Sequence, residues 1–97
     1  MEYLVTMTTR VPDGTPEQAV DDVRAREAAH SRDLAARGHL LRLWRLPPGG
    51  PSALGLWRAV DVAEMAAIVR SLPLDAWLTT DITPLSTHPG DPVLAVP

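Results

Sequence analysis

Three features of this 97-residue sequence predict an α+β fold. Two segments repeat apolar residues every three to four positions, which is typical of amphipathic helices. Four short segments alternate apolar with polar residues or are rich in residues that favour strands. Clusters of proline and glycine separate these segments and give the order βαββαβ. This order predicts a ferredoxin-like domain, in which two helices cover one face of a four-stranded antiparallel sheet.

The four strands are expected over residues 2–9, 39–46, 53–59 and 77–83. The first, EYLVTMTT, alternates along its length and places Tyr3, Val5 and Met7 on one face. The second, HLLRLWRL, mixes apolar and charged residues on both faces. Both faces of the sheet should therefore be partly covered, one by the helices and the other by a second copy of the chain.

The two helices are predicted from their start signals as well as from their periodicity. Thr15 is the expected N-cap of the first, with Pro16 at the first helical position and Gln18 completing a capping box. The second helix is expected over residues 61–72, with Asp61 as its N-cap. Residues 1–89 are expected to form a single domain, and residues 90–97 an extended, proline-rich tail.

Composition excludes several classes of function. A net charge of −3 without a basic cluster argues against nucleic-acid and membrane-surface partners. The sequence has no cysteine, which excludes thiolate chemistry, and no lysine, which leaves arginine to recognise anions. No apolar run reaches the length of a membrane span, and the N-terminus lacks the pattern of a signal peptide. We therefore expect a cytoplasmic protein.

An unusual apolar stripe on the first helix suggests a catalytic site. The stripe consists of Val20, Val23, Glu27, His30 and Leu34. Because this face should be buried, its carboxylate is shielded from water, which suits a general base. Glu27 is therefore the first candidate for a catalytic residue. The alternative is a structural acid that forms an ion pair with a nearby arginine.

His30 lies three residues after Glu27, so the two side chains can approach each other. His30 could orient Glu27, share its proton or donate a hydrogen bond to substrate, and it is the second candidate catalytic residue. The alternative is a histidine that packs where helix and sheet meet. A metal site would need further ligands, and only His39 and His88 remain among the histidines. We expect neither a metal nor another cofactor.

The second strand supplies the candidates for substrate binding. Arg45 and Arg42 lie on opposite faces of this strand, and a guanidinium can bind a carboxylate with two parallel hydrogen bonds. Arg45 is the stronger candidate. Trp44 could form a flat apolar wall beside a substrate, although packing in a core or interface is the commoner role of tryptophan.

The sequence resembles the muconolactone isomerase family over nearly its whole length, from Met1 to about Pro89. The resemblance rests on Val5-x-Met7-Thr8, Glu27, Leu43-Trp44-Arg45, Leu72-Pro73-Leu74 and His88-Pro89, in this order. It implies a cofactor-independent isomerase of the β-ketoadipate pathway of aromatic catabolism, which converts (+)-muconolactone to its enol-lactone isomer. It also implies a dimeric αβ-barrel that can assemble further into a homodecamer.

Departures from the family leave two other functions open. Thr6 stands where the family typically carries a polar or basic residue, and the loop and third strand read PPGGPSALG where aromatic and histidine residues are typical. One alternative is a cofactor-free monooxygenase or cyclase that acts on a natural-product intermediate. The other is a non-catalytic module that binds a small ligand.

Overall fold

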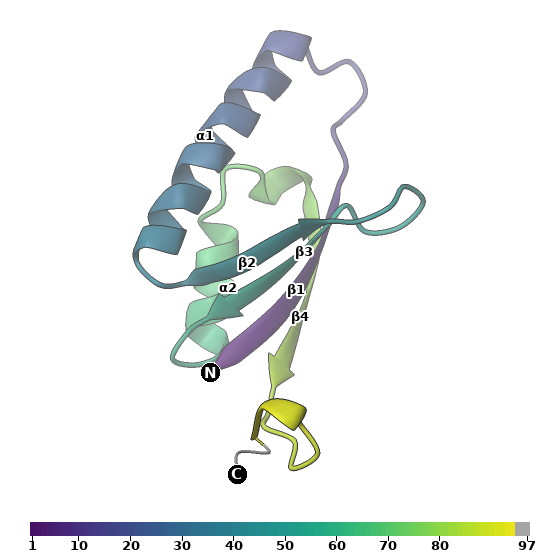
Figure 1. Ribbon diagram of the computed structural model, residues 1–97. Coiled ribbons are helices and arrows are strands. Elements are labelled where there is room, and N and C mark those ends of the chain that lie inside the picture. The colour runs from purple at the N-terminus through teal and green to yellow at the C-terminus, as the bar shows by residue number, and fades with distance from the viewer. Residues whose placement is uncertain (95–97) are drawn as a thin grey trace.

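The computed structural model describes residues 1–94 and confirms the ferredoxin-like fold. Its main elements are β1 (Glu2–Thr9), α1 (Glu17–Ala36), β2 (Leu40–Arg45), β3 (Ala53–Arg58), α2 (Val62–Arg70) and β4 (Leu78–Leu85). Short 3₁₀ turns follow α2 and β4, namely η1 (Asp75–Trp77) and η2 (Pro92–Leu94). The strands form one antiparallel sheet in the order β2-β3-β1-β4, and both helices lie on the same face of it (Figure 1).

The hydrophobic core fills the space between this face and the helices. Its buried members are Tyr3, Val5, Met7, Leu34, Trp57, Ala59, Met65, Ile68, Val69 and Leu72. The alternation predicted for β1 is confirmed, because Tyr3, Val5 and Met7 all point into the core. The indole of Trp57 covers Gly55, where any Cβ atom would collide with the ring nitrogen. A glycine at this position therefore lets the largest core side chain lie against its own strand.

The start of α1 differs from the prediction. Thr15 is not an N-cap, because Pro16 holds that position and caps the helix with no side-chain hydrogen bond. The Thr15 hydroxyl instead donates to the carbonyl of Pro12 at 2.6 Å, which closes the preceding turn. The predicted capping box was therefore wrong. At α2 the prediction is confirmed, since Asp61 accepts a hydrogen bond from the Glu64 amide at 2.8 Å.

The last strand is longer than the sequence indicated. Pro84 lies within β4, where we had expected the strand to end at residue 83. β4 is an edge strand, so one of its sides has no neighbour and a missing N–H costs little there. Trp77, expected in the strand, belongs to η1.

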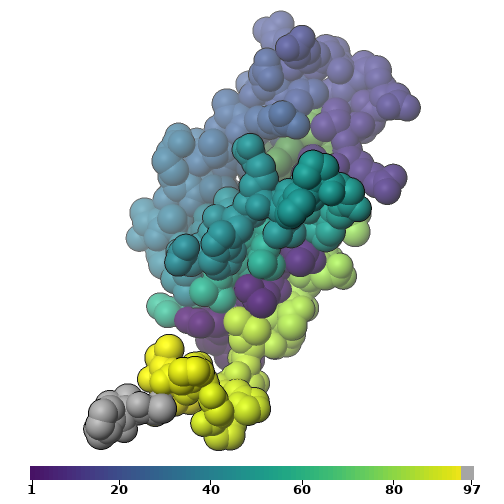
Figure 2. All heavy atoms as spheres, turned by 45° about the vertical axis from the view of Figure 1, so that its right-hand side comes forward, coloured from purple at the N-terminus to yellow at the C-terminus, as the bar shows by residue number. Residues whose placement is uncertain are grey.

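The segment that follows β4 lies at one end of the molecule, apart from the helices (Figures 1 and 2). It includes the η2 turn, so residues 92–94 are not extended as predicted. Residues 95–97 of the expected tail lie outside the described residues. Within residues 1–94, no helix is both long and apolar enough to cross a membrane.

Candidate active site

The helix face that carries Glu27 is partly buried against the rest of the domain, with Leu34 as its one fully buried residue. Six residues of α1 are not exposed, namely Val20, Val23, Glu27, His30, Ser31 and Leu34. They include the whole predicted stripe, which confirms that α1 turns this face inward. Glu27 is half-buried near the middle of the helix. The carboxylate of Glu27 therefore lies at the boundary between the packed interior and the side of the helix.

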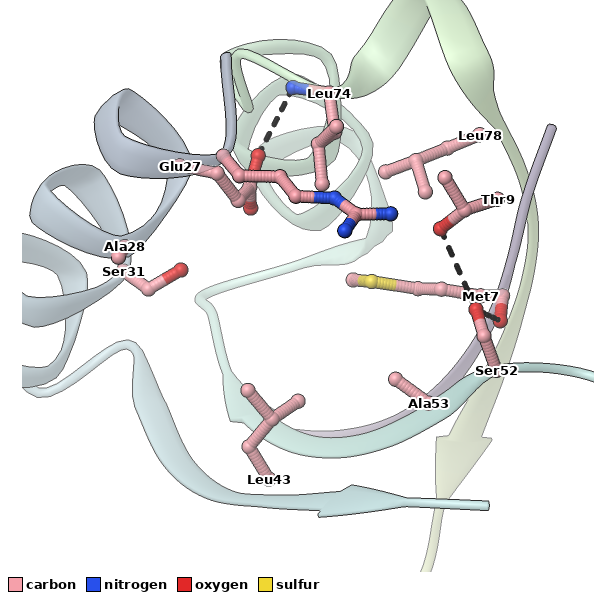
Figure 3. A pocket seen from close by; sticks show the side chains of 11 residues that line it. Met7, Thr9, Glu27, Ala28, Ser31, Leu43, Ser52, Ala53, Leu74 and Leu78 are labelled. Carbon is pink, nitrogen blue, oxygen red and sulfur yellow. Dashed lines mark hydrogen bonds between the residues drawn. The ribbon is translucent and has the colours of Figure 1, made fainter. Parts of the chain in front are cut away.

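A cavity of about 270 Å³ lies beside Glu27, between α1, the sheet and the segment that follows α2. Its walls are largely apolar and include Met7 from β1, Leu43 from β2, Leu74 and Leu78 (Figure 3). The polar residues that line it are Thr9, Arg24, Glu27, Ser31 and Ser52. Three of these five, Arg24, Glu27 and Ser31, come from one face of α1. The cavity therefore brings an acid, a cation and a hydroxyl together in apolar surroundings.

Glu27 is held in position by the backbone that follows α2. The amide of Leu74 donates a hydrogen bond to Glu27 Oε1 at 2.9 Å (Figure 3). Within residues 1–94, Glu27 forms no ion pair, and Oε2 has no hydrogen-bond partner. The expected alternative, an acid neutralised by an arginine, is therefore not what the structure contains. One oxygen of the carboxylate is fixed and the other is free to accept a proton.

Arg24 is the cation that lines this cavity. The neighbouring Arg26 pairs with Asp22 at 3.3 Å, and Arg37 pairs with Asp33 at 3.0 Å, both along the exposed side of α1. Arg24 has no such partner among the described residues. Its guanidinium can therefore bind an anion from outside the chain without first breaking an ion pair.

His30 lies outside the cavity and links the two helices. Its Nε2 is 2.9 Å from the hydroxyl of Ser71. Ser71 donates its one hydroxyl hydrogen to the carbonyl of Ile68 at 2.6 Å, so Nε2 must be the donor to Ser71. The structure thus does not bring His30 to Glu27 as a partner, although the helical spacing is as expected. The environment of His30 is that of the alternative, a histidine that packs between elements.

The predicted substrate-binding residues of β2 are divided between the two faces of the sheet. Arg45 lies on the same face as Leu43, in a shallow hollow that shares Leu43, Ser52 and Ala53 with the cavity. Trp44 lies opposite Leu54 on the other face, and the guanidinium of Arg42 stacks 5.0 Å from the centre of its ring. Arg45 is therefore near the cavity, and Trp44 also borders this hollow from the edge of the strand. Neither Arg42 nor Trp44 is among the residues that line the cavity beside Glu27.

Arg24 and Ser31 are functional candidates that the sequence prediction missed. They lie three residues before and four residues after Glu27, which is the spacing of one helix face. This spacing was the available signal, but a charged and a hydroxyl residue at the edge of an apolar stripe resemble ordinary surface positions. Among residues 1–94, no three acidic, histidine or cysteine side chains cluster in a way that could hold a metal.

Comparison of the sequence with protein families and with individual proteins finds muconolactone delta-isomerases in each case. The family model described as muconolactone delta-isomerase matches residues 1–91. The chain is 33% identical over 90 residues to Muconolactone Delta-isomerase 1 of Acinetobacter lwoffii, an alignment that covers 93% of each chain. It is 30% identical over 90 residues to Muconolactone Delta-isomerase of Cupriavidus pinatubonensis, covering 93% of this chain and 97% of the relative.

Solved structures show the same fold. A crystal structure of muconolactone isomerase superposes with a TM-score of 0.83 at 22% identity, covering 93% of both chains. The 5-chloro-2-hydroxyhydroquinone dehydrochlorinase of Burkholderia phenoliruptrix, solved with 2,5-dihydroxybenzoquinone, superposes with a TM-score of 0.66 at 15% identity. That alignment covers 91% of this chain and 96% of the other.

Proposed function

Because the chain belongs to the muconolactone Delta-isomerase family, we propose that it isomerises (+)-muconolactone or a closely related unsaturated lactone without a cofactor. The observation that carries this proposal is the cavity beside Glu27, whose carboxylate is anchored by one oxygen and unpaired at the other. Such a group can remove a proton and return it, and that is all the chemistry the reaction requires.

The proposed reaction balances without any co-reactant. Oε2 of Glu27 removes the acidic hydrogen from the ring carbon of the lactone, and the C–H electron pair enters the conjugated system. The result is a dienolate with its negative charge on the carbonyl oxygen. Glu27 then returns the proton to a different carbon of the same system, which moves the double bond. The Leu74 amide keeps the carboxylate oriented through both steps.

We assign the substrate carboxylate to Arg24. Arg24 is an exposed residue that lines the rim of an apolar cavity, and it forms no ion pair among the described residues, so its guanidinium is available for charge-assisted hydrogen bonds to a carboxylate. Arg45, the candidate expected from sequence, faces the neighbouring hollow and is the second choice. Arg42 and Trp44 occupy the opposite face of the sheet and take no part in this assignment.

The cavity also bears on the two alternative functions. A barrel that has lost its chemistry predicts that Glu27 is exposed or ion-paired, with no cavity beside it. Among the described residues, Glu27 is half-buried, forms no ion pair and lines a cavity. A monooxygenase or cyclase acting on a polycyclic substrate needs a large apolar pocket. The cavity of about 270 Å³ lies at the lower end of the range for ligand pockets, roughly 300 to 1,000 Å³. A five-membered lactone is the better match in size.

The direct test is the activity of the purified protein. Incubation with (+)-muconolactone is expected to change the ultraviolet absorbance as the conjugated double bond moves, and nuclear magnetic resonance should identify the enol-lactone product. Activity should persist after treatment with a chelator and extensive dialysis. A protein that stays inert at micromolar enzyme concentration over hours would overturn the assignment of this substrate.

We further propose that the protein works as a homodimer, joined through the sheet face that carries no helix. This face presents Leu4 from β1, Leu54 and Leu56 from β3, and Trp44 from β2. The side chain of Trp44 is 38% exposed. Charged residues, among them Arg42 opposite Leu56 and Asp81 opposite Thr6, lie beside this apolar patch on the same face. Contiguous apolar patches on a sheet mark interaction surfaces. A second copy is the natural cover, and two such sheets face to face would make the expected αβ-barrel.

Leu56→Arg is expected to convert the dimer to monomer, because it puts a charge at the centre of this face. The measurement is sedimentation equilibrium at several protein concentrations. Ala25→Arg is the matched control, since Ala25 is exposed on α1 and receives the same charge. A Leu56→Arg protein that keeps the mass of the wild type would show that this face is not the interface.

A further inference from the structure

We propose that Ser31 is a catalytic residue, whose hydroxyl donates a hydrogen bond to the lactone carbonyl oxygen as negative charge develops on it. The inference rests on the proposed isomerase function. Ser31 follows Glu27 by four residues, is half-buried and lines the same cavity. Figure 3 shows its hydroxyl oxygen directed from α1 toward the cavity. Within residues 1–94 this hydroxyl has no hydrogen-bond partner of its own.

The other neutral polar groups of the cavity are less able to play this part. Ser52 donates its hydrogen to the carbonyl of Met7 at 2.9 Å, and the Thr9 hydroxyl lies 3.4 Å from that of Ser52. The Leu74 amide donates to Glu27. Serines in and at the ends of helices often bond back to a carbonyl of the preceding turn, as Ser71, the C-cap of α2, does to Ile68. Ser31 does not, so its donor is available to a ligand.

The order of the three groups along α1 matches the order of groups on the proposed substrate. Arg24, Glu27 and Ser31 follow one another along one face, separated by about 4.5 Å and about 6 Å of helix rise. In (+)-muconolactone, the carbon that loses its proton carries the carboxylate arm on one side and connects through the ring to the carbonyl on the other. A substrate lying along α1 with its carboxylate at Arg24 therefore brings its acidic carbon to Glu27 and its carbonyl oxygen to Ser31.

This alignment also defines a class of substrate. The ligand should carry a carboxylate and a conjugated carbonyl on opposite sides of an acidic carbon.

The Ser31 hydroxyl should act mainly on the transition state. A hydrogen-bond donor already positioned where negative charge develops contributes strongly to catalysis, because it does not have to reorganise during the reaction. The gain arises in the transition state, where the oxygen is most negative. Loss of the donor should therefore reduce kcat and leave KM nearly unchanged.

The test compares Ser31→Ala, Ser31→Thr and Ser71→Ala with the wild type on (+)-muconolactone. Ser31→Ala is expected to lower kcat by about 10²-fold, as loss of one oxyanion donor typically does, with KM within about threefold. Ser31→Thr keeps a hydroxyl and should retain most of the activity. Ser71→Ala removes the serine hydroxyl at the C-cap of α2, outside the cavity, and should leave kcat within about twofold of the wild type.

The outcomes separate this inference from the proposed function. If the wild type is active and Ser31→Ala has the same kcat, the role of Ser31 is overturned and the isomerase assignment stands. The role is also overturned if Ser31→Ala raises KM alone, because that describes ground-state binding. If Ser31→Ala unfolds, the activity of Ser31→Thr decides, since only a variant with a hydroxyl should retain kcat. If the wild type is inert on this lactone, both proposals fall together.

Discussion

Glu27→Gln is expected to lower kcat for (+)-muconolactone by about 10³-fold, the range that general acid–base catalysis usually contributes. Glutamine has nearly the same shape as glutamate, and its oxygen can still accept the hydrogen bond from the Leu74 amide. The cavity should keep its form, and no charge is left buried without a partner. What is lost is the ability to carry a proton. Initial rates and single-turnover experiments with substrate would measure this loss.

The matched control is Glu17→Gln, which makes the same change at an exposed acid in the first turn of the same helix. Its kcat should equal that of the wild type, and circular dichroism should show both variants folded. A Glu27→Gln protein with more than about a tenth of the wild-type kcat would contradict the role of Glu27 as the base. The proton would then have to be carried by another group or by water.

The fold could be predicted because its signals are local. The alternation of β1, the proline- and glycine-rich boundaries and the Asp61 cap are each visible in a few consecutive residues. The capping-box error is local, because the Thr15 hydroxyl donates to the Pro12 carbonyl instead of capping the helix. The error at the end of β4 arose where neighbours distant in sequence decide the outcome. Pro84 remains in β4 because that strand lies at the edge of the sheet, and the strand order is set by tertiary structure.

The site could be predicted only in part for the same reason. Glu27 was identifiable because an acid on an apolar stripe is unusual. His30 is equally unusual, but its partner Ser71 lies 41 residues away at the C-cap of α2, and no helical pattern could reveal that contact. The cavity depends on where α1 crosses the sheet. The position of the cavity makes Arg24 and Ser31 part of the site, although arginine and serine are residue types that are common on protein surfaces.

These facts suggest that α1 has two working sides that share Glu27. Leu34 is buried in the core, and His30 forms a hydrogen bond with Ser71 at the end of α2, so this side holds the helix in place. Arg24 and Ser31 turn toward the cavity, where they are free to meet a ligand. The predicted stripe turns inward as one face, and Arg24 and Ser31 lie beside it along the cavity, so that Glu27 belongs both to the packing face and to the cavity lining. Glu27 lines the cavity, whereas His30 does not and bonds Ser71 instead. The helical spacing of the two residues therefore did not predict that they act together.

Arg24→Gln is expected to raise KM for (+)-muconolactone by about 10- to 100-fold, the value of a charge-assisted hydrogen bond, and to change kcat by only a fewfold. The carboxylate has the same charge in the ground state and the transition state, so its binding should be lost equally from both. Arg26→Gln is the matched control, because Arg26 lies two residues away on the same helix and is paired with Asp22 on the exposed side. Its KM should not change.

The methyl ester of muconolactone makes this test specific for the carboxylate. The wild type should favour the acid over the ester by the same factor by which Arg24→Gln raises KM, and Arg24→Gln should discriminate little between the two. Arg45→Gln distinguishes the remaining possibility. If Arg45→Gln abolishes the preference for the acid and Arg24→Gln keeps it, the carboxylate lies in the hollow beside β2. The substrate would then not lie along α1, and the order of Arg24, Glu27 and Ser31 could no longer explain how the carbonyl reaches its donor.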